Sequence, residues 1–431
     1  MFGLVNPCCF IFLYAEIDIS AIEAIIIKSN ILQMTPLNVT GKVHWIGVND
    51  RRKHLFENMW PLDNGVAYNC YLILDGQTAL VDTVELRSGG DFVAKVESLL
   101  KGRTLDYLII NHMEPDHSGE IRAIIDRYPK VKLVGNLKTF KIVEAYWGIK
   151  DNLYMVEDGH TLDLGYHKLK FVMTPWVHWP ETMMTFDETN GILFSGDAFG
   201  SFGTLDGGVF DDEINFDFYE SEMRRYYSNI VGKYSNMVQK AFKKLEGVPV
   251  KVVCPTHGPV WRSNPAKVLG LYDKWSKYET EEGVVIIYAS MYGSTEELAD
   301  HIARQLVENG ITNIRVFDVS KTHISHLINA IWQYKGVILG SVAYNSEMFP
   351  LMEQLTRELE HMAVKGHLLG IFGSFSWNGG GARSLFKFSE AIEWELVAEP
   401  VDIYGMPNDE KLERCSSVAA GMANRLKALR K

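Results

Sequence analysis

The feature that most constrains the fold is a change of pattern near residue 280. Before the polar, charged segment 277–283, short apolar runs are joined by tight turns such as Asp75-Gly76 and Asn190-Gly191, which is typical of β-hairpins. After this segment, short apolar runs alternate with amphipathic stretches, which indicates a doubly wound parallel sheet. We therefore predict two domains, at 34–280 and 283–431. A chain of 431 residues suits this division, because single cores rarely exceed about 300 residues.

Residues 1–33 stand apart from both domains. Their apolar runs, at 10–14 and 25–27, are separated by acidic residues and are too short to span a membrane. No Lys or Arg precedes the first run, although a secretory signal would carry positive charge there. We interpret this segment as an N-terminal extension of unknown role, with Met34 as a natural start, and we expect a cytoplasmic protein without a membrane partner.

Charge and cysteine content exclude several classes of protein. The net charge is −11, which argues against a nucleic-acid partner because phosphate binding requires a basic face. The five cysteines form no Cys-x-x-Cys pair, so we expect neither a zinc ribbon nor a rubredoxin-type centre within the chain. An odd cysteine count without regular spacing fits a reducing compartment.

Seven possible metal ligands follow predicted strands of the first domain. The apolar run 105–110 predicts a buried strand, and four of the ligands come directly after it. The full set is His112, Glu114, Asp116, His117, His178, Asp197 and His257. Alternating residues of an extended loop point to opposite sides, so one short motif can supply ligands to two adjacent metals. Seven ligands suit two ions that share a carboxylate, for which Asp197 is our candidate.

The type of ligand narrows the choice of metal. Four imidazoles and three carboxylates, with no thiolate, form a nitrogen and oxygen site, which suits non-haem iron or manganese as well as zinc. Each of these residues taken alone is more often a surface, core or capping residue. Their density and their positions after strands favour a metal centre.

Three loops of the second domain suggest a phosphate-bearing, flat cofactor. The first follows a strand predicted at 284–288 and opens a helix predicted at 296–309, where hydroxyls and backbone N–H groups can bind a phosphate. It lacks both the Gly-x-Gly-x-x-Gly pattern of dinucleotide sites and the Lys of triphosphate sites. Strands predicted at 336–339 and 368–372 lead into the other two loops, on the same edge of the sheet. The residues expected to bind the cofactor are Ser290, Met291, Tyr292, Gly293, Ser294, Thr295, Ser341, Val342, Ala343, Tyr344, Asn345, Ser374, Phe375, Ser376, Trp377, Asn378 and Gly379.

These motifs together resemble those of the flavodiiron family, over residues 35–431. Six of the seven ligand positions match the metal pattern of the metallo-β-lactamase fold, and Glu114 replaces the second histidine of its His-x-His-x-Asp-His motif, as is typical of flavodiiron proteins. The resemblance implies an N-terminal metallo-β-lactamase-like αββα sandwich and a C-terminal flavodoxin-like doubly wound sheet. It implies FMN and two iron ions per chain as cofactors.

The resemblance also implies roles for individual residues. His112, Glu114 and His178 match the ligands of one iron, and Asp116, His117 and His257 match those of the other, with Asp197 as the bridge. In some family members the residue that matches His117 is turned away from the metal. The loops 290–295 and 374–380 match flavodoxin, whereas Val342-Ala343 replaces the usual Pro-Thr of the middle loop.

The activity implied by the resemblance is reduction of O₂ to water, of NO to N₂O, or of both. A flavin and two irons together can hold four electrons, which is the number that complete reduction of O₂ requires. Electrons are expected to arrive from an external donor such as rubredoxin, and a head-to-tail homodimer or dimer of dimers is expected to bring each flavin to its partner's irons. The segment 53–60 aligns with the loop that shapes the gas pocket in the family. It differs from family members that carry His and Tyr there, and we expect O₂ as the preferred substrate.

Two alternatives remain open from the sequence. One is a zinc hydrolase of the metallo-β-lactamase fold with a redox appendage, against which Glu114 and the His178-Trp179-Pro180 context both count. The other is an electron carrier whose metal domain has lost its activity, against which the complete ligand set counts. The metal content separates the hydrolase from the diiron enzyme.

Overall fold

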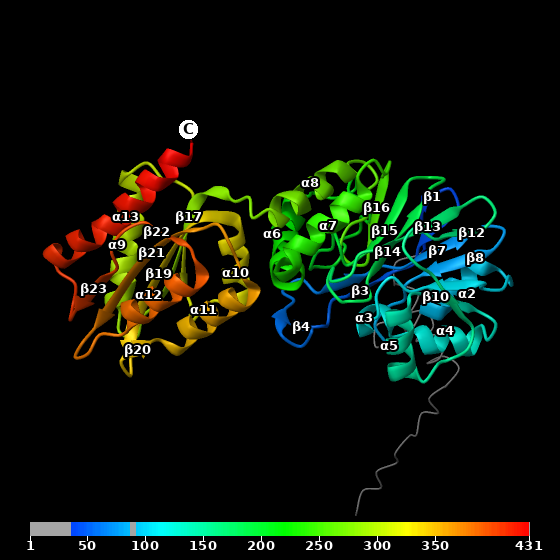
Figure 1. Ribbon diagram of the computed structural model, residues 1–431, viewed down its shortest axis with the longest axis horizontal. Helices are drawn as coiled ribbons and strands as arrows, with labels where there is room; N and C mark the ends of the chain where they lie inside the picture. Colours follow the sequence, from blue (N-terminus) through cyan, green and yellow to red (C-terminus); the bar gives the residue numbers. More distant parts are fainter. Residues whose placement is uncertain (1–35, 87–91, 431) are drawn as a thin grey trace, which may run out of the picture.

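The structure, a computed structural model, describes residues 36–86 and 92–430. It consists of two domains that lie side by side along the long axis of the molecule (Figure 1). The N-terminal extension predicted at 1–33 lies outside the described residues. Within the described part of the chain, no helix is long and apolar enough to cross a bilayer.

The first domain contains two facing sheets. The first sheet has the strand order β1-β2-β7-β8-β9-β10-β11, and the second has the order β12-β13-β14-β15-β16. The predicted hairpins are present, since β7 pairs with β8 and β14 with β15 in antiparallel register. The bounds are β1 Leu37–Thr40, β2 Val43–Trp45, β7 Tyr71–Leu74, β8 Thr78–Val81, β9 Tyr107–Ile109, β10 Lys132–Gly135, β11 Leu153–Met155, β12 Thr161–Asp163, β13 Lys168–Met173, β14 Met183–Asp187, β15 Ile192–Gly196 and β16 Val252–Pro255.

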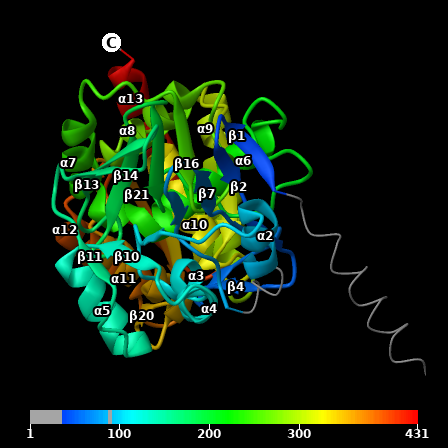
Figure 2. The same cartoon turned by 90° about the vertical axis from the view of Figure 1, so that its right-hand side faces the viewer.

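Alternation along these strands explains the layers. In β7, Tyr71 and Ile73 join a core cluster between the sheets, whereas Leu72 joins the cluster beneath the outer helices. Both sides of the strand are apolar because both are covered. Helices on the two outer faces complete the predicted αββα sandwich (Figure 2). They are α2 Phe92–Leu100, α4 Ile121–Arg127 and α5 Leu137–Trp147 on the first sheet, and α7 Ser235–Leu245 and α8 Pro265–Ser276 on the second.

Two small hairpins lie beside the sandwich. One joins β3 Val48–Asp50 to β6 Val66–Tyr68, and the other joins β4 Leu55–Phe56 to β5 Trp60–Pro61. A helical arm, α6 Asp217–Tyr226, continues into the single π-helical turn Tyr227–Val231. This arm faces the second domain (Figure 1).

The second domain is a doubly wound sheet, as predicted. Its strand order is β18-β17-β19-β21-β22, and β23 also pairs with β21, all in parallel. The strands are β17 Glu281–Ala289, β18 Ile314–Asp318, β19 Tyr334–Tyr344, β20 Glu347–Met348, β21 Leu368–Phe375, β22 Glu395–Leu396 and β23 Val401–Tyr404. Its helices are α9 Ser294–Glu308, α10 Ile324–Gln333, α11 Pro350–Met362, α12 Gly381–Ile392 and α13 Asp409–Leu429. Helices α9 and α13 cover one face, and α10, α11 and α12 cover the other.

The contact between the domains is built from α6, the π-helical turn and α10. Trp332 of α10 lies with its ring centroid 5.9 Å from that of Tyr227, and its indole N–H donates to the carbonyl of Trp275. Gly232 follows the turn, and a Cβ there would come within 2.7 Å of the Trp332 ring, so a glycine allows this close approach. The aromatic part of the contact is therefore closely packed.

Candidate metal centre and flavin site

The metal-ligand candidates meet where strands of both sheets end. His112 follows β9, Asp197 follows β15 and His257 follows β16. Parallel neighbours β8 to β10, and β15 with β16, direct their carboxyl ends to the same edge of the sandwich. His178 reaches this edge from the loop between β13 and β14. Positions up to 145 residues apart, from His112 to His257, are brought together in this way.

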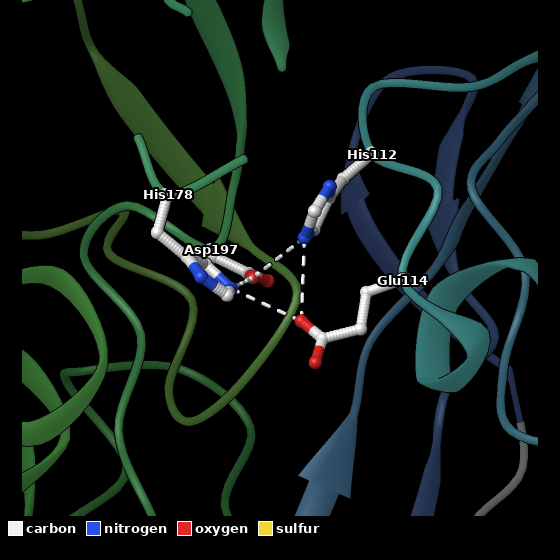
Figure 3. Close-up of side chains that lie close together, drawn as sticks. All are labelled: His112, Glu114, His178 and Asp197. Atoms are coloured by element: carbon white, nitrogen blue, oxygen red, sulfur yellow. Dashed lines mark hydrogen bonds and ion pairs between the residues drawn. The ribbon is translucent and has the colours of Figure 1, made fainter. Parts of the chain in front are cut away.

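One half of the site consists of His112, Glu114, His178 and one oxygen of Asp197 (Figure 3). The Nε2 atoms of His112 and His178 lie 3.3 and 3.0 Å from Glu114 Oε2. The same nitrogens lie 3.4 and 3.1 Å from Asp197 Oδ2. Two imidazoles and two carboxylates thus face a common point, and all four side chains are buried.

The other half consists of Asp116, His117 and His257. The Nε2 atoms of both histidines lie 3.3 Å from Asp116 Oδ2. Asp197 turns its second oxygen, Oδ1, to this group, 2.8 Å from His117 and 3.7 Å from His257. Asp197 therefore presents one oxygen to each half, which is the geometry of a bridging carboxylate. His117 points into the site here.

The backbone reaches this arrangement differently from the predicted extended loop. Residues 115–118 form a short helical turn, α3 (Pro115–Ser118), with Glu114 at its N-cap. The main-chain carbonyl of His117 accepts hydrogen bonds from the Thr83 backbone and hydroxyl, which fixes the turn against the residues that follow β8. The prediction of an extended motif was wrong for this half. A helical turn, not strand alternation, separates Asp116 and His117 from Glu114.

Several buried atoms of this site lack a hydrogen-bond partner, which is a test of fit for metal ions. They include both oxygens of Asp116, Asp197 Oδ2 and the Nε2 atoms of His117 and His257. Buried polar atoms without partners are costly, by about 1–3 kcal/mol each. Atoms that converge on two points and carry lone pairs are explained by bound cations, so the residues fit a pair of metal ions.

A second set of contacts orients the ligands. Glu181 Oε1 lies 2.7 Å from His112 Nδ1 and accepts a bond from the Met113 backbone at 3.0 Å. His257 Nδ1 donates to the carbonyl of Ala67 at 2.8 Å, and the Thr256 hydroxyl donates to Asp197 Oδ1 at 2.6 Å. Such partners fix the tautomer and direction of metal-binding imidazoles. Sequence reasoning missed Glu181. The only signal for it in the sequence was that a carboxylate stands three residues after the predicted ligand His178.

When no metal is present, the electrostatics of the cluster favour protons on His117 and His178. Burial alone would lower the pKa of His178, but the Asp197 and Glu114 carboxylates together raise it to about 10. Burial likewise opposes charge on His117, yet Asp116 and Asp197 raise its pKa to about 9. The pKa of Asp197 lies well below its usual range despite burial, because His117 and His112 stabilise the carboxylate. Cations are strongly favoured here.

A cavity of about 500 Å³ opens beside Glu114 and Asp116. Its walls include the β4–β5 hairpin and the preceding residues 53–54, the segment that we predicted to shape the gas pocket. Loss of water around Glu57, together with the charge of Glu114, raises the pKa of Glu57 to about 7. The hairpin thus places an ionisable carboxyl group beside the metal ligands.

A second cavity, of about 400 Å³, lies at the carboxyl edge of the second sheet. Ser290 accepts a hydrogen bond from the Gly293 backbone, and the Thr295 and Ser374 hydroxyls meet at 2.8 Å, so the first and third loops are joined. Of the predicted residues, those that line the cavity are Ser290, Met291, Tyr292, Ser294, Thr295, Val342, Ala343, Ser374, Phe375, Ser376, Trp377 and Asn378. The remaining five lie in the same loops but are not among its lining residues: Gly293, Ser341, Tyr344, Asn345 and Gly379. Gly405 and Met406, which sequence reasoning missed, line it as well.

Comparison with known proteins agrees with this architecture. Residues 66–258 match the family described as "ODP family beta lactamase", and residues 286–416 match "Flavodoxin". A nitric oxide reductase of Moorella thermoacetica is 30% identical over 396 residues, which cover 91% of this chain and 99% of that protein. An anaerobic nitric oxide reductase flavorubredoxin of Pectobacterium atrosepticum is 30% identical over 80% of this chain and 69% of its own length.

Solved structures agree as well. Rubredoxin oxygen:oxidoreductase from Desulfovibrio gigas superposes with a TM-score of 0.87 at 28% identity, covering 91% of this chain and 99% of that one. A variant of the flavo di-iron protein from Thermotoga maritima gives a TM-score of 0.83 at 27% identity, covering 91% and 100%.

A sandwich with paired histidine and carboxylate groups, joined to a flavin-binding domain, defines an oxidoreductase that couples a flavin to a metal pair. Among such enzymes, this chain belongs to the flavodiiron family. Its cofactors are FMN and a diiron centre.

Proposed function

We propose that this protein reduces nitric oxide and dioxygen at the centre formed by His112, Glu114, Asp116, His117, His178, Asp197 and His257. The position of Asp197 carries this proposal, because its two oxygens face separate ligand groups 2.8 to 3.7 Å away. The names of similar proteins refer to both gases: those from Moorella and Pectobacterium refer to nitric oxide, and the one from Desulfovibrio refers to oxygen. The expected preference for O₂ is therefore tested by the ratio of the rates at which the protein consumes the two gases.

The protein's own residues have distinct tasks in this reaction. When bound, FMN supplies electrons and the two irons bind and polarise the gas. Each half of the ligand set contributes two imidazoles and one carboxylate of its own, and Asp197 holds the halves at a fixed separation. Glu181 directs the ring of His112. Glu57 lines the cavity beside Glu114, where a carboxyl group is placed to exchange protons with the cavity.

We further propose that an external carrier such as rubredoxin supplies the electrons, and that two chains associate head to tail. The rim of the FMN cavity exposes unusually large apolar side chains, with Tyr292 91% exposed and Trp377 74% exposed. An exposed apolar rim is typical of an interface. The metal cavity of a second chain is the partner proposed for it. Sedimentation that gives a fully active monomer would contradict the head-to-tail association.

Metal analysis followed by a gas assay tests the proposed reaction. The purified protein is expected to contain two irons per chain and, with its flavin photoreduced without air, to consume each gas when supplied separately. Two zinc ions with no gas consumption would support the hydrolase instead. Consumption of one gas alone would narrow the proposal to that gas.

A further inference from the structure

The FMN cavity has a wall that its three predicted loops do not account for. Gly405 and Met406, which follow β23, line the cavity. The Ser294 hydroxyl donates to the sulfur of Met406 at 3.4 Å, and the Gly405 backbone donates to the carbonyl of Phe375 at 2.8 Å. Gly405 has a φ of +71°, a conformation that glycine adopts without strain. The segment 404–406 is therefore tied both to the first loop and to the third.

A single lysine fastens this segment from behind. Lys411, in the first turn of α13, donates from Nζ to the carbonyl of Tyr404 at 2.7 Å and to that of Met406 at 2.8 Å. These contacts place its ammonium directly behind the segment that touches Ser294. Ser294 begins α9, where a phosphate is expected to bind.

The residues that line the cavity provide no positively charged side chain to balance the phosphate of FMN. FMN carries a phosphate monoester, which is close to a dianion at neutral pH, and none of the lining residues is Lys or Arg. The N-terminus of α9 offers only about half a positive charge. A lysine ammonium acts as a compact point charge that remains effective a few ångströms behind a wall.

We propose that the segment 404–406, fastened by Lys411, closes the phosphate end of the FMN site, and that Lys411 supplies the positive charge that the lining lacks. This inference rests on the proposed FMN site in the second domain. It adds a fourth loop and a cation to that site.

The test compares FMN with riboflavin, which has the same ring but no phosphate. The full-length, iron-loaded protein is freed of flavin, and both ligands are titrated into wild type, Lys411→Gln and Lys427→Gln. Lys427 lies near the opposite end of α13 and serves as the matched control. We expect Lys411→Gln to bind FMN about tenfold more weakly and riboflavin within twofold of wild type, because only FMN carries the charge that Lys411 stabilises. Lys427→Gln is expected to bind both ligands like wild type.

The salt dependence of flavin binding is a second test, and it uses only the wild-type protein. The wild-type Kd for FMN is expected to rise with ionic strength, and that for riboflavin to stay constant. An FMN affinity within twofold of wild type in Lys411→Gln would overturn the inference, as would an equal loss for riboflavin. If wild type itself bound neither flavin, the proposed FMN site would fail, which is a separate outcome.

Discussion

Glu114 gives the two halves of the metal centre the same composition. With Glu114 present, each half has two histidines and one carboxylate of its own, and Asp197 is shared. A histidine at this position would instead give one half three imidazoles and leave the other unchanged. The hard oxygen of Glu114 adds negative charge, which favours iron over softer ions. Glu114 thus sets the symmetry of the ligand set, and we expect it to favour iron as well.

Exchange of this residue should therefore change the metal that is bound. We expect Glu114→His to retain two metals per chain but to raise the zinc-to-iron ratio at least about tenfold when the protein is produced with both metals supplied. Elemental analysis measures the ratio. Glu188→Gln, on the exposed turn after β14, is the control and should leave it unchanged. An unchanged ratio in Glu114→His would show that the metal is selected elsewhere.

Glu181 acts on the metal through His112. Glu181→Gln keeps the size of the side chain and an oxygen for the Met113 backbone, but removes the charge that stabilises the His112 N–H. We expect iron affinity to fall about 10- to 100-fold, as for other residues that orient metal ligands. Competition with a chelator measures this change. Equal iron retention in both proteins would mean that the backbone alone positions His112.

The protons on the metal-free cluster predict a dependence of stability on pH. In the folded, metal-free chain the pKa values of His178 and His117 are about 10 and about 9, above the ordinary value near 6.5. Their contribution to stability is therefore complete below about pH 6.5 and is lost as pH rises through 9 to 10. We expect the melting temperature of the metal-free protein to fall between pH 7 and 10.5. The melting temperature of the iron-loaded protein should fall much less over this range, because its metal-bound imidazoles are already neutral. Parallel curves of melting temperature against pH for the two forms would contradict this account.

At the scale of elements, helix caps connect local structure to the site. The side chain of Asn136 caps α5 by accepting from the backbones of Lys138 and Thr139, and its amide donates to the carbonyl of Glu181 at 2.6 Å. The side chain of Asn264 caps α8 in the same way, by accepting from the backbone of Lys267. The two caps therefore differ in that only the Asn136 side chain also binds the backbone of Glu181.

Replacement of the two caps separates stability from metal binding. We expect Asn136→Ala and Asn264→Ala each to lower the free energy of unfolding by about 1 kcal/mol, because each leaves helix N–H groups unpaired. Urea titration measures this loss. Only Asn136→Ala should also weaken iron retention, since it alone releases the Glu181 backbone. Equal retention in both variants would remove Asn136 from the support of the site.

The same scale shows what the sequence could predict. The strands before His112, Asp197 and His257 were predictable, because short apolar runs ending in polar groups mark buried strand ends. Contacts across the fold were not predictable. Glu181 approaches His112 over 69 positions, and Met406 approaches Ser294 over 112. Local periodicity carries no information about contacts between residues so far apart in the sequence. The helical turn after Glu114 was not predicted because the alternating spacing of the ligands also suits an extended loop.

At the scale of the whole molecule, two neighbouring buried arginines, Arg224 and Arg225, bond across the two domains, and Arg225 does so near the metal cavity. The Arg225 guanidinium donates to the carbonyl of Pro61 at 2.9 Å and to the Ser325 hydroxyl at 3.1 Å, and it pairs with Glu222. Its side chain is fully buried, and its guanidinium carbon lies 4.5 Å from the centroid of the Phe202 ring. Pro61 ends the β4–β5 hairpin that borders the metal cavity. Arg225 thus links this wall to the N-terminus of α10 in the flavin domain.

Loss of this arginine should loosen both the chain and the cavity wall. We expect Arg225→Met to lower the free energy of unfolding by about 3 kcal/mol, because it breaks a buried ion pair and leaves a carbonyl and a hydroxyl unpaired. We also expect the two domains to unfold at different urea concentrations, since the hydrogen bond from Arg225 to Ser325 is lost and the coupling between the domains is weakened. Urea titration followed by tryptophan fluorescence and by flavin release distinguishes the two domains. Arg304→Met is the control, since it removes only an exposed pair with Glu308 within α9, and it should leave the midpoint unchanged. If the two probes still coincide in Arg225→Met, the remaining contacts couple the domains, among them the hydrogen bond from Arg224 to Asn329 and the aromatic contact around Trp332. The hairpin beside the metals is then held by its own half of the molecule.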